Sequence, residues 1–593
     1  MEDKILDWAV LAEKFISGGD PNSMRPVARE IFELDKNSAE GLAIMAESSL
    51  YLGNFEEAES LAEYALSVEA KNLRGRLVLG GVAVKNFRLR DQIRILDSVI
   101  NDAHDAIKNL RAELQSHNRK FAFNLRRRTS DDTEFEQRID KKIFLAKAIL
   151  FKALCWLSNG LYLTGDPARA ANLLSEASGL TDKNDLAAEL YSKHLFLKNY
   201  RELSAKQAKD LAQKFNAFFA EVEPFTHDKN LRADKKIRIG YISPDFREHA
   251  VSNFIPPLLE HYDAENFSVT CYSTGKNDFV TDKLKKFKVE WRDLAGEEPI
   301  NAAQIIAEDK LDILVDLSGH SQDSCLPILA YKPAPVQICG IGYTSTTGLD
   351  AVDYFLSDGI CSPENLPSVF TEKILRVEPC SLCYAPGFIR KIPDVEIRAP
   401  LLKNGFITYG CFNNFAKITE EILYIWRAIL ERVPRARLIL KNKLCSLDEG
   451  RELIKEKLRK MSFPVERIEL RPYSCDYLEQ YGDIDVALDT FPYTGGTTTC
   501  EALIMGVPVI TIRGKTHGSR LGASILNAAD CSELIAHSPM DYLEKAVKLS
   551  RRQELISAYH VGLREHIKNS ALTDSQEYIR ELEKIYRAIC KGG

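Results

Sequence analysis

Hydrophobic positions along the chain follow two different patterns. Residues 1–225 are rich in Ala, Leu, Glu and Lys, and their apolar positions recur at helical spacing. After residue 236, short apolar runs typical of buried strands alternate with helix-like segments. We therefore predict three domains: an all-helical one at 1–225 and two α/β domains at 226–400 and 401–593.

Two segments of the helical region resemble each other. Residues 51–58 and 162–170 each join a helix end to a glycine-bearing turn and a second helix with small residues. This pattern is typical of tetratricopeptide repeats, whose helix pairs stack into a superhelix. Residues 86–139 depart from it and carry many charges, which predicts a long helical excursion or a partly mobile insert. The basic triplet 126–128 in this segment is predicted to be a solvent-exposed surface, and the alternative is that it contacts an acidic partner.

Each α/β domain is expected to hold one doubly wound parallel sheet. Ligands in such sheets bind at the carboxyl ends of the strands, so the loops of both domains should point into one cleft. Helix-like segments such as 253–261 and 302–308 separate the strands. The predicted strands are 237–242, 267–272, 313–317, 336–341, 354–357, 407–412, 437–441, 468–471, 484–488 and 507–512.

The stretch 483–512 carries the main candidate site. It reads as a strand, a polar glycine loop, a helix and a second strand. Backbone N–H groups and threonine hydroxyls at such a helix N-terminus favour a phosphate, and Glu501 in the first turn could accept hydrogen bonds from a ribose. The alternative is an ordinary loop with a threonine helix cap. The candidate binding residues are Gly495, Gly496, Thr497, Thr498, Thr499 and Glu501.

Other strand ends carry further candidates. His249 follows the first α/β strand and could take a proton or steady a pyrophosphate, although it could equally cap the next helix. His320 follows the strand 313–317 and is a second candidate for the cleft. Lys417, beside Asn414, could pair with a diphosphate and stabilise the charge that grows on it as a leaving group. Most lysines are merely solvated, so its position near the glycine loop carries this hypothesis.

Composition and charge restrict the class of protein. The 593 residues carry a net charge of −6, which gives no reason to expect nucleic-acid binding. The N-terminus bears acids where a signal peptide needs bases, and no apolar run approaches the length of a membrane span, so we expect a cytoplasmic protein. The 13 cysteines are scattered, and the single pair Cys380 and Cys383 lacks partners for zinc.

The motifs of metal, hydride and ATP chemistry are missing from the sequence. It contains no DxD pair at a strand end, no HExxH, no GxGxxG and no GxxxxGK[ST]. We therefore expect a mechanism without a metal or cofactor, in which Lys417 and the helix N-terminus stabilise negative charge.

Four motifs together resemble a known family. Residues 237–249, 332–337, 411–419 and 488–501 are similar to the O-GlcNAc transferase and SPINDLY family, glycosyltransferase family 41. The resemblance covers roughly residues 235 to 590. It implies a GT-B fold, an inverting and metal-independent transfer, and tetratricopeptide repeats that present a protein acceptor.

The resemblance also implies roles for single residues. This chain departs from the animal members at Gly496, where they have histidine, and at Asn414, where they have glutamine. By position, Lys417 looks like the lysine on the donor diphosphate, Asn414 like a donor-contacting amide, Thr497 and Thr498 like the phosphate-binding pair, Glu501 like the acid on the ribose, and His249 like a proposed catalytic base.

The donor and the acceptor remain open between several hypotheses. The residues in these motifs are more similar to the SPINDLY branch, whose plant members use GDP-fucose. Compact bacterial-looking members are associated with UDP-GlcNAc and with flagellin or other surface proteins, so we choose UDP-GlcNAc as the donor and a protein, flagellin for example, as the acceptor.

Three alternatives stand beside this choice: a GDP-fucose-dependent protein O-fucosyltransferase, an inactive repeat scaffold, and a GT-B enzyme of small glycans such as an epimerase. Deleting residues 1–225 should abolish transfer to protein and spare donor hydrolysis, whereas an enzyme of small glycans would lose only stability. Repeat superhelices often dimerise, so a homo-oligomer is a further hypothesis.

Overall fold

The chain forms two compact units. The structure, a computed structural model, describes residues 1–124, 129–227, 236–393 and 398–591. The units comprise Met1–Leu190 and Tyr191–Gly593, and helix α9 (Asn184–Lys198) runs across the division. The first unit is helical and the second contains both sheets, so the predicted fold class is confirmed. The three-domain boundaries stay a prediction.

The first unit consists of helices that pack against their neighbours in sequence. Both repeat-like turns occur as predicted: Gly53 between α3 and α4 and Gly165 between α7 and α8 have φ of 85° and 88°, which glycine adopts most readily. Fully buried alanines such as Ala58 and Ala62 let the helices approach closely. The helices are α1 (Glu2–Ser17), α2 (Met24–Leu34), α3 (Ala39–Tyr51), α4 (Phe55–Val68), α5 (Leu73–Lys85), α6 (Leu89–Asn124), α7 (Ser130–Leu163) and α8 (Pro167–Ser178).

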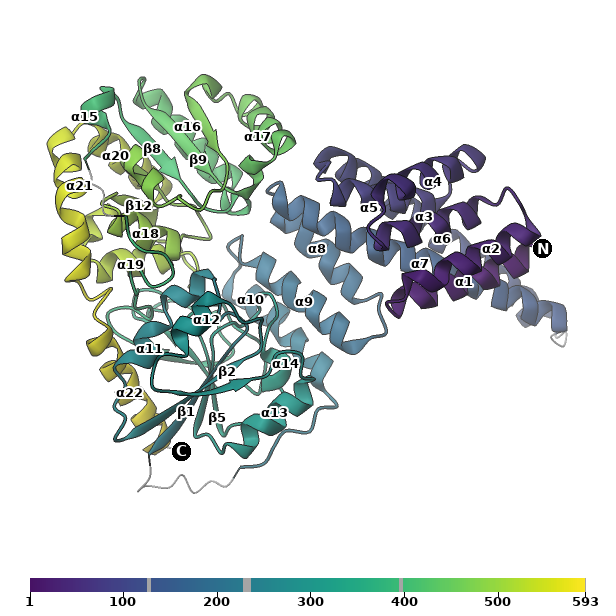
Figure 1. Cartoon of the computed structure of the whole chain (residues 1–593), viewed down its shortest axis with the longest axis horizontal. Helices are drawn as coiled ribbons and strands as arrows, with labels where there is room; N and C mark the ends of the chain where they lie inside the picture. Colours follow the sequence, from purple (N-terminus) through teal and green to yellow (C-terminus); the bar gives the residue numbers. More distant parts are fainter. Residues whose placement is uncertain (125–128, 228–235, 394–397, 592–593) are drawn as a thin grey trace. The chain divides into compact units, whose positions relative to one another are not determined.

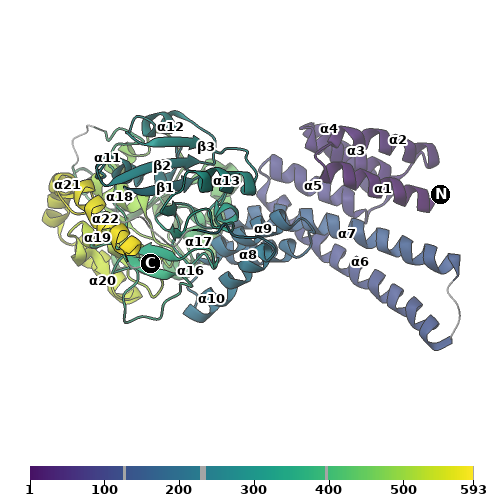
Figure 2. The same cartoon turned by 90° about the horizontal axis from the view of Figure 1, so that it is seen from below.

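The charged excursion is a long helical hairpin. Helices α6 and α7 pack along each other, and Figure 2 shows them extending together past the other helices of this unit. The triplet 126–128 lies outside the described residues. Contrary to the sequence-based expectation, one helix of the described chain, α7, is long and apolar enough to cross a membrane, although half of its apolar window is buried. Helices buried in a protein core have the same composition.

The first sheet of the second unit is entirely parallel, with strand order β3-β2-β1-β4-β5-β6-β7. The five predicted strands of this sheet are present, and β3 and β7 add one strand at each edge. The strands are β1 (Ile237–Ser243), β2 (Phe267–Ser273), β3 (Glu290–Asp293), β4 (Ile313–Asp316), β5 (Val336–Cys339), β6 (Tyr354–Ser357) and β7 (Lys373–Arg376). The helices are α10 (Ala205–Gln213), α11 (Pro256–Glu260), α12 (Phe279–Leu284), α13 (Pro299–Glu308) and α14 (Leu326–Leu329).

The second sheet is also parallel, with order β10-β9-β8-β11-β12-β13. Its five predicted strands are present. The strands are β8 (Thr408–Cys411), β9 (Arg437–Lys441), β10 (Ile468–Arg471), β11 (Val486–Leu488), β12 (Val509–Ile512) and β13 (Ile535–Ala536). The helices are α15 (Leu401–Asn404), α16 (Glu420–Arg432), α17 (Asp448–Lys460), α18 (Thr497–Ile504), α19 (Leu521–Ala528), α20 (Pro539–Ser550), α21 (Gln553–Lys568) and α22 (Ser575–Lys591).

The last helix returns to the first sheet. Tyr578, Leu582 and Tyr586 of α22 are buried in the same apolar core as β1 and α11, and Figure 1 shows this helix, in yellow, beside β1. We call the first sheet with its helices and α22 the first lobe, and the second sheet with its helices the second lobe. The chain therefore crosses between the lobes twice.

Candidate functional site

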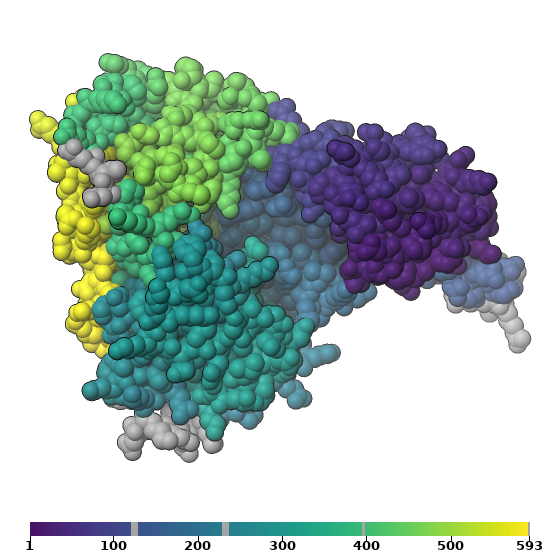
Figure 3. Space-filling view, in the orientation of Figure 1, coloured from purple at the N-terminus to yellow at the C-terminus, as the bar shows by residue number. Residues whose placement is uncertain are grey.

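A cavity of about 600 Å³ lies between the two lobes of the second unit. The first lobe, teal in Figure 3, and the second lobe, green, meet along one side of the molecule. Loops that follow β1, β8 and β9 line the cavity, together with the start of α18, as the parallel topology predicts. The predicted site residues in its wall are His249, Asn414, Thr497, Thr498 and Glu501.

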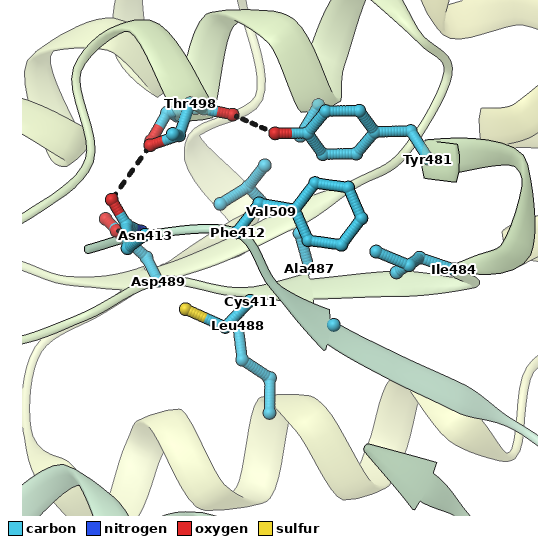
Figure 4. A pocket seen from close by; sticks show the side chains of 13 residues that line it. Cys411, Phe412, Asn413, Tyr481, Ile484, Ala487, Leu488, Asp489, Thr498 and Val509 are labelled. Atoms are coloured by element: carbon cyan, nitrogen blue, oxygen red, sulfur yellow. Dashed lines mark hydrogen bonds between the residues drawn. The ribbon is translucent and has the colours of Figure 1, made fainter. Parts of the chain in front are cut away.

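The N-terminus of α18 forms part of the wall. Thr497 and Thr498 occupy its first two positions, and the Oγ1 of Thr497 donates to the carbonyl of Ala250 in the first lobe, at 3.2 Å, where the two lobes touch beside the cavity. The Oγ1 of Thr498 donates to Asn413 Oδ1 at 2.9 Å, while its carbonyl accepts from Tyr481, as Figure 4 shows. The backbone N–H groups of Thr499 and Cys500 donate to the carbonyl of Gly496, so the groups that could stabilise an anion at the cavity wall are those of Thr497 and Thr498.

The glycine loop before α18 is shaped by Asp489. This carboxylate is 2% exposed and accepts from the backbone of Gly495 at 2.7 Å and from the hydroxyl of Thr511 at 2.7 Å. Burial raises the pKa of Asp489 to about 6. Thr499 faces a separate cavity of about 20 Å³ below the loop, large enough for one water molecule. Gly495, Gly496 and Thr499 thus support the wall without lining the larger cavity.

Lys417 lies beside this loop. Its Nζ donates to the carbonyl of Thr494 at 3.0 Å and sits 4.1 Å from the ring centre of Tyr493. Burial lowers the pKa of Lys417 to about 8, against the attraction of Asp489. The residue does not line the cavity in this structure, so a contact with a donor phosphate requires the side chain or the loop beside it to move; the three donors of the ammonium group allow the bond to Thr494 to persist.

Glu501 lies in the second turn of α18 and not in the first as predicted, because the helix begins at Thr497. It is held by Tyr477, whose hydroxyl donates to the carboxylate. Its side chain faces the cavity although the residue is only 6% exposed. Burial raises the pKa of Glu501 to about 7, and Arg390 opposes this effect. A carboxylate so placed can accept hydrogen bonds from ribose hydroxyls once it is ionised.

His249 stands on the opposite wall. Its Nδ1 accepts a hydrogen bond from the backbone N–H of Val251 at 3.4 Å, so the ring caps the short helix Ala250–Asn253, as the alternative prediction stated. The same Nδ1 lies 3.4 Å from a carboxylate oxygen of Asp245. Loss of hydration lowers the pKa of His249, although Asp245 acts in the other direction. The bond from Val251 requires a lone pair on Nδ1 and places the proton of the neutral ring on Nε2, whereas the tautomer that donates from Nδ1 to Asp245 leaves Nε2 free to accept a proton. The ring can therefore act as a base in the second tautomer only.

The expectation that His320 faces the cleft is wrong. It is fully buried; its Nδ1 pairs with Ser192 and its Nε2 with the carbonyl of Thr347. Cys380 and Cys383 are buried as well, and no disulfide joins the 13 cysteines. Within the described ranges, no group of three or more His, Cys, Asp or Glu side chains could hold a metal ion.

Three residues of the site escaped the sequence-based prediction. Asp489 comes directly after β11, a strand-end position that could have suggested a role at the cleft. Tyr477 and Arg390 come from irregular segments on either side of the cavity, and no sequence pattern marks them. Their importance depends on contacts between segments far apart in the chain.

Two parallel sheets that share one cavity, with a helix N-terminus in its wall, define the GT-B class of folds. The sequence matches the family described as "Glycosyl transferase family 41" over residues 190–380 and 398–582. The chain belongs to glycosyltransferase family 41, so the predicted family is confirmed.

Individual relatives agree with this assignment. The chain is 36% identical over 391 residues to the probable UDP-N-acetylglucosamine-peptide N-acetylglucosaminyltransferase SPINDLY of Solanum lycopersicum, and 28% identical over 381 residues to the one named SEC of Arabidopsis thaliana. These matches cover 64% and 61% of this chain but only 41% and 38% of the relatives. A solved variant of the Thermobaculum terrenum O-GlcNAc transferase is 26% identical and aligns over 100% of this chain and 98% of its own, with a TM-score of 0.66.

Proposed function

We propose that this chain transfers GlcNAc from UDP-GlcNAc to Ser or Thr hydroxyls of a protein, with inversion and without a metal ion. The observation that carries the proposal is the cavity between the lobes of a family 41 member. There, the threonine-bearing start of α18 and Glu501 lie opposite His249. The names of the Solanum lycopersicum and Thermobaculum terrenum relatives refer to N-acetylglucosamine transfer and support this choice of donor.

The proposed reaction exchanges one bond at the sugar for another. The acceptor oxygen attacks the anomeric carbon from the face opposite the diphosphate, and the bond to the diphosphate oxygen breaks with its electron pair. The hydroxyl proton passes to Nε2 of His249 or to a phosphate oxygen of the donor. Negative charge that grows on the diphosphate is stabilised by the first N–H groups of α18 and by Lys417.

The partners are part of the same proposal. The helical unit presents the protein acceptor, with flagellin as one candidate, and the enzyme acts in the cytoplasm. The absence of disulfides among the 13 cysteines fits a reducing compartment. Neither a nucleic acid nor a membrane takes part in the proposed reaction.

Calorimetry of the purified protein with UDP-GlcNAc and with GDP-fucose, in the presence of EDTA, tests the donor and the metal independence together. Tighter binding of UDP-GlcNAc supports the proposal. Preference for GDP-fucose would make the chain a fucosyltransferase of the SPINDLY type, and binding of neither would favour an inactive scaffold. Mass spectrometry of a candidate acceptor after incubation with the preferred donor then detects the transferred sugar.

A further inference from the structure

The segment that connects the two lobes crosses one side of the cavity. We call residues 384–393 the strap. Gly387, Ile389, Arg390 and Ile392 of the strap line the cavity. Its first part is fixed to the first lobe, because the backbone nitrogen of Ala385 donates to the carbonyl of Asn253 at 2.7 Å. The remainder lines the cavity in which we propose that a nucleotide binds.

One side chain of the strap reaches both lobes. The guanidinium of Arg390 forms an ion pair with Glu248 of the first lobe. It also donates to the carbonyl of Cys475 in the second lobe, at 3.4 Å, and lies 5.8 Å from the ring centre of Tyr477. The Arg390 side chain remains 28% exposed at the cavity wall. A single cation therefore bridges the two sides of the cavity.

Each partner of Arg390 adjoins a residue of the candidate site. Glu248 precedes His249, the candidate base, in the sequence. Tyr477 donates its hydroxyl to Glu501, the candidate ribose ligand. Displacement of Arg390 would therefore disturb the base on one wall and the ribose acceptor on the other.

We propose that Arg390 is a positioning residue that ties the His249 loop to the Tyr477 loop and holds the strap over a bound nucleoside diphosphate. The inference rests on the proposed function, because it requires a nucleotide in this cavity. Partly exposed ion pairs change an equilibrium by a few-fold, and the backbone and ring contacts of Arg390 add to that effect. A faster release of nucleotide, with little effect on folding, is the expected consequence of its loss.

The first test compares two arginines of similar exposure. Arg390→Ala should weaken UDP binding by about tenfold in calorimetry, mainly through a higher dissociation rate. Arg427→Ala is the matched control, since Arg427 pairs with Glu431 on α16, is 31% exposed and does not line the cavity. Equal UDP affinity for Arg390→Ala and the parent protein would overturn the inference, and so would a loss of thermal stability without a loss of affinity.

An exchange of the two charges distinguishes the effect of the Glu248–Arg390 ion pair from the effect of the other contacts of Arg390. Glu248→Arg and Arg390→Glu should each weaken UDP binding, because each places like charges together. The protein that carries both changes should bind UDP more tightly than either single variant, as a restored pair requires. Purely additive losses would show that the pair does not couple the two loops.

The exposed thiol of Cys475 reports on the strap without an assay of transfer. In the parent protein, UDP should slow its reaction with a maleimide, followed by mass spectrometry of the labelled peptide. In Arg390→Ala this protection should be largely lost at equal occupancy of UDP. Full protection in the variant would overturn the inference alone, whereas failure of the parent protein to bind either UDP or GDP would overturn the proposed function with it.

Discussion

Lys417 is charged over only part of the useful pH range, because burial lowers its pKa to about 8. If its ammonium group stabilises the departing diphosphate, turnover should fall as pH rises through about 8 and the amine loses its proton. Lys417→Ala should reduce kcat by about 10²- to 10³-fold and leave the fold intact. Initial rates between pH 6 and 10, together with thermal melting, check both expectations.

A second lysine provides the control for this effect. Lys457 also lies near an aromatic ring, 6.0 Å from the centre of Phe415, but it does not line the cavity. Lys457→Ala should keep parental turnover. The alkaline fall should shift upward in Lys417→Arg, because guanidinium stays charged. If turnover of that variant falls at the same alkaline pH as turnover of the parent protein, the proposed role of Lys417 is contradicted.

The carboxyl group of Glu501 is expected to limit donor binding at acidic pH. Burial raises its pKa to about 7, so it becomes neutral as pH falls through that value and can no longer accept two ribose hydrogen bonds. Donor affinity should therefore decline several-fold between pH 8 and 5.5. Calorimetry of Glu501→Gln should give weaker binding with little dependence on pH in this range. The same acidic decline in Glu501→Gln would assign the titration to another group.

Residue positions at the cavity could be predicted from the sequence where a side chain follows a strand or starts a helix. His249, Thr497 and Thr498 met this condition, and the structure places them in one cavity. His320 also met it but is buried, because Ser192 from a distant segment occupies its Nδ1. Strand position predicts the edge of the sheet at which a residue lies, whereas packing decides whether it reaches the cavity.

The loop before α18 tolerates a side chain at one glycine and not at its neighbour. A Cβ at Gly495 would come within 2.6 Å of the hydroxyl oxygens of Thr498 and Thr499, whereas one at Gly496 would touch only Leu521, at 3.7 Å. Gly495→Ala should therefore lower the free energy of unfolding by about 1–3 kcal/mol and weaken donor binding. Gly496→Ala should keep the parental melting temperature. Differential scanning calorimetry compares the two, and equal melting would refute the predicted crowding.

Elements with continuous apolar runs could be predicted closely from the sequence. The bounds of β6 and β9, both interior strands with mostly buried residues, agree with the predicted strands. Strand β10 was also predicted with its observed bounds, although it lies at an edge of the second sheet. Strands β3 and β7 were missed because they mix exposed charged residues, such as Glu290 and Lys373, with apolar side chains. An edge strand needs only one paired neighbour, so its sequence carries a weaker signal.

The packing of the second unit indicates that a truncation to remove the helical region should begin before residue 191 and not at residue 226. The segment after Tyr191 packs inside the second unit: Ser192 pairs with His320, Glu202 accepts from the backbone of Lys515 at 2.8 Å, and Phe215 is 1% exposed. Loss of Phe215 alone would cost about 3–5 kcal/mol. A protein of residues 184–593, which keeps α9 entire, should fold and bind UDP, whereas one of residues 226–593 should melt lower or aggregate.

This pair of truncations also tests what the helical unit contributes. If that unit presents the acceptor, residues 184–593 should hydrolyse the sugar nucleotide at the parental rate and lose transfer to protein. Donor hydrolysis, followed by release of the nucleoside diphosphate, and acceptor labelling, followed by mass spectrometry, measure the two activities separately. Retained transfer to protein would mean that the second unit recognises the acceptor by itself. That result would not contradict the assignment of the donor site, because all of its residues belong to the second unit.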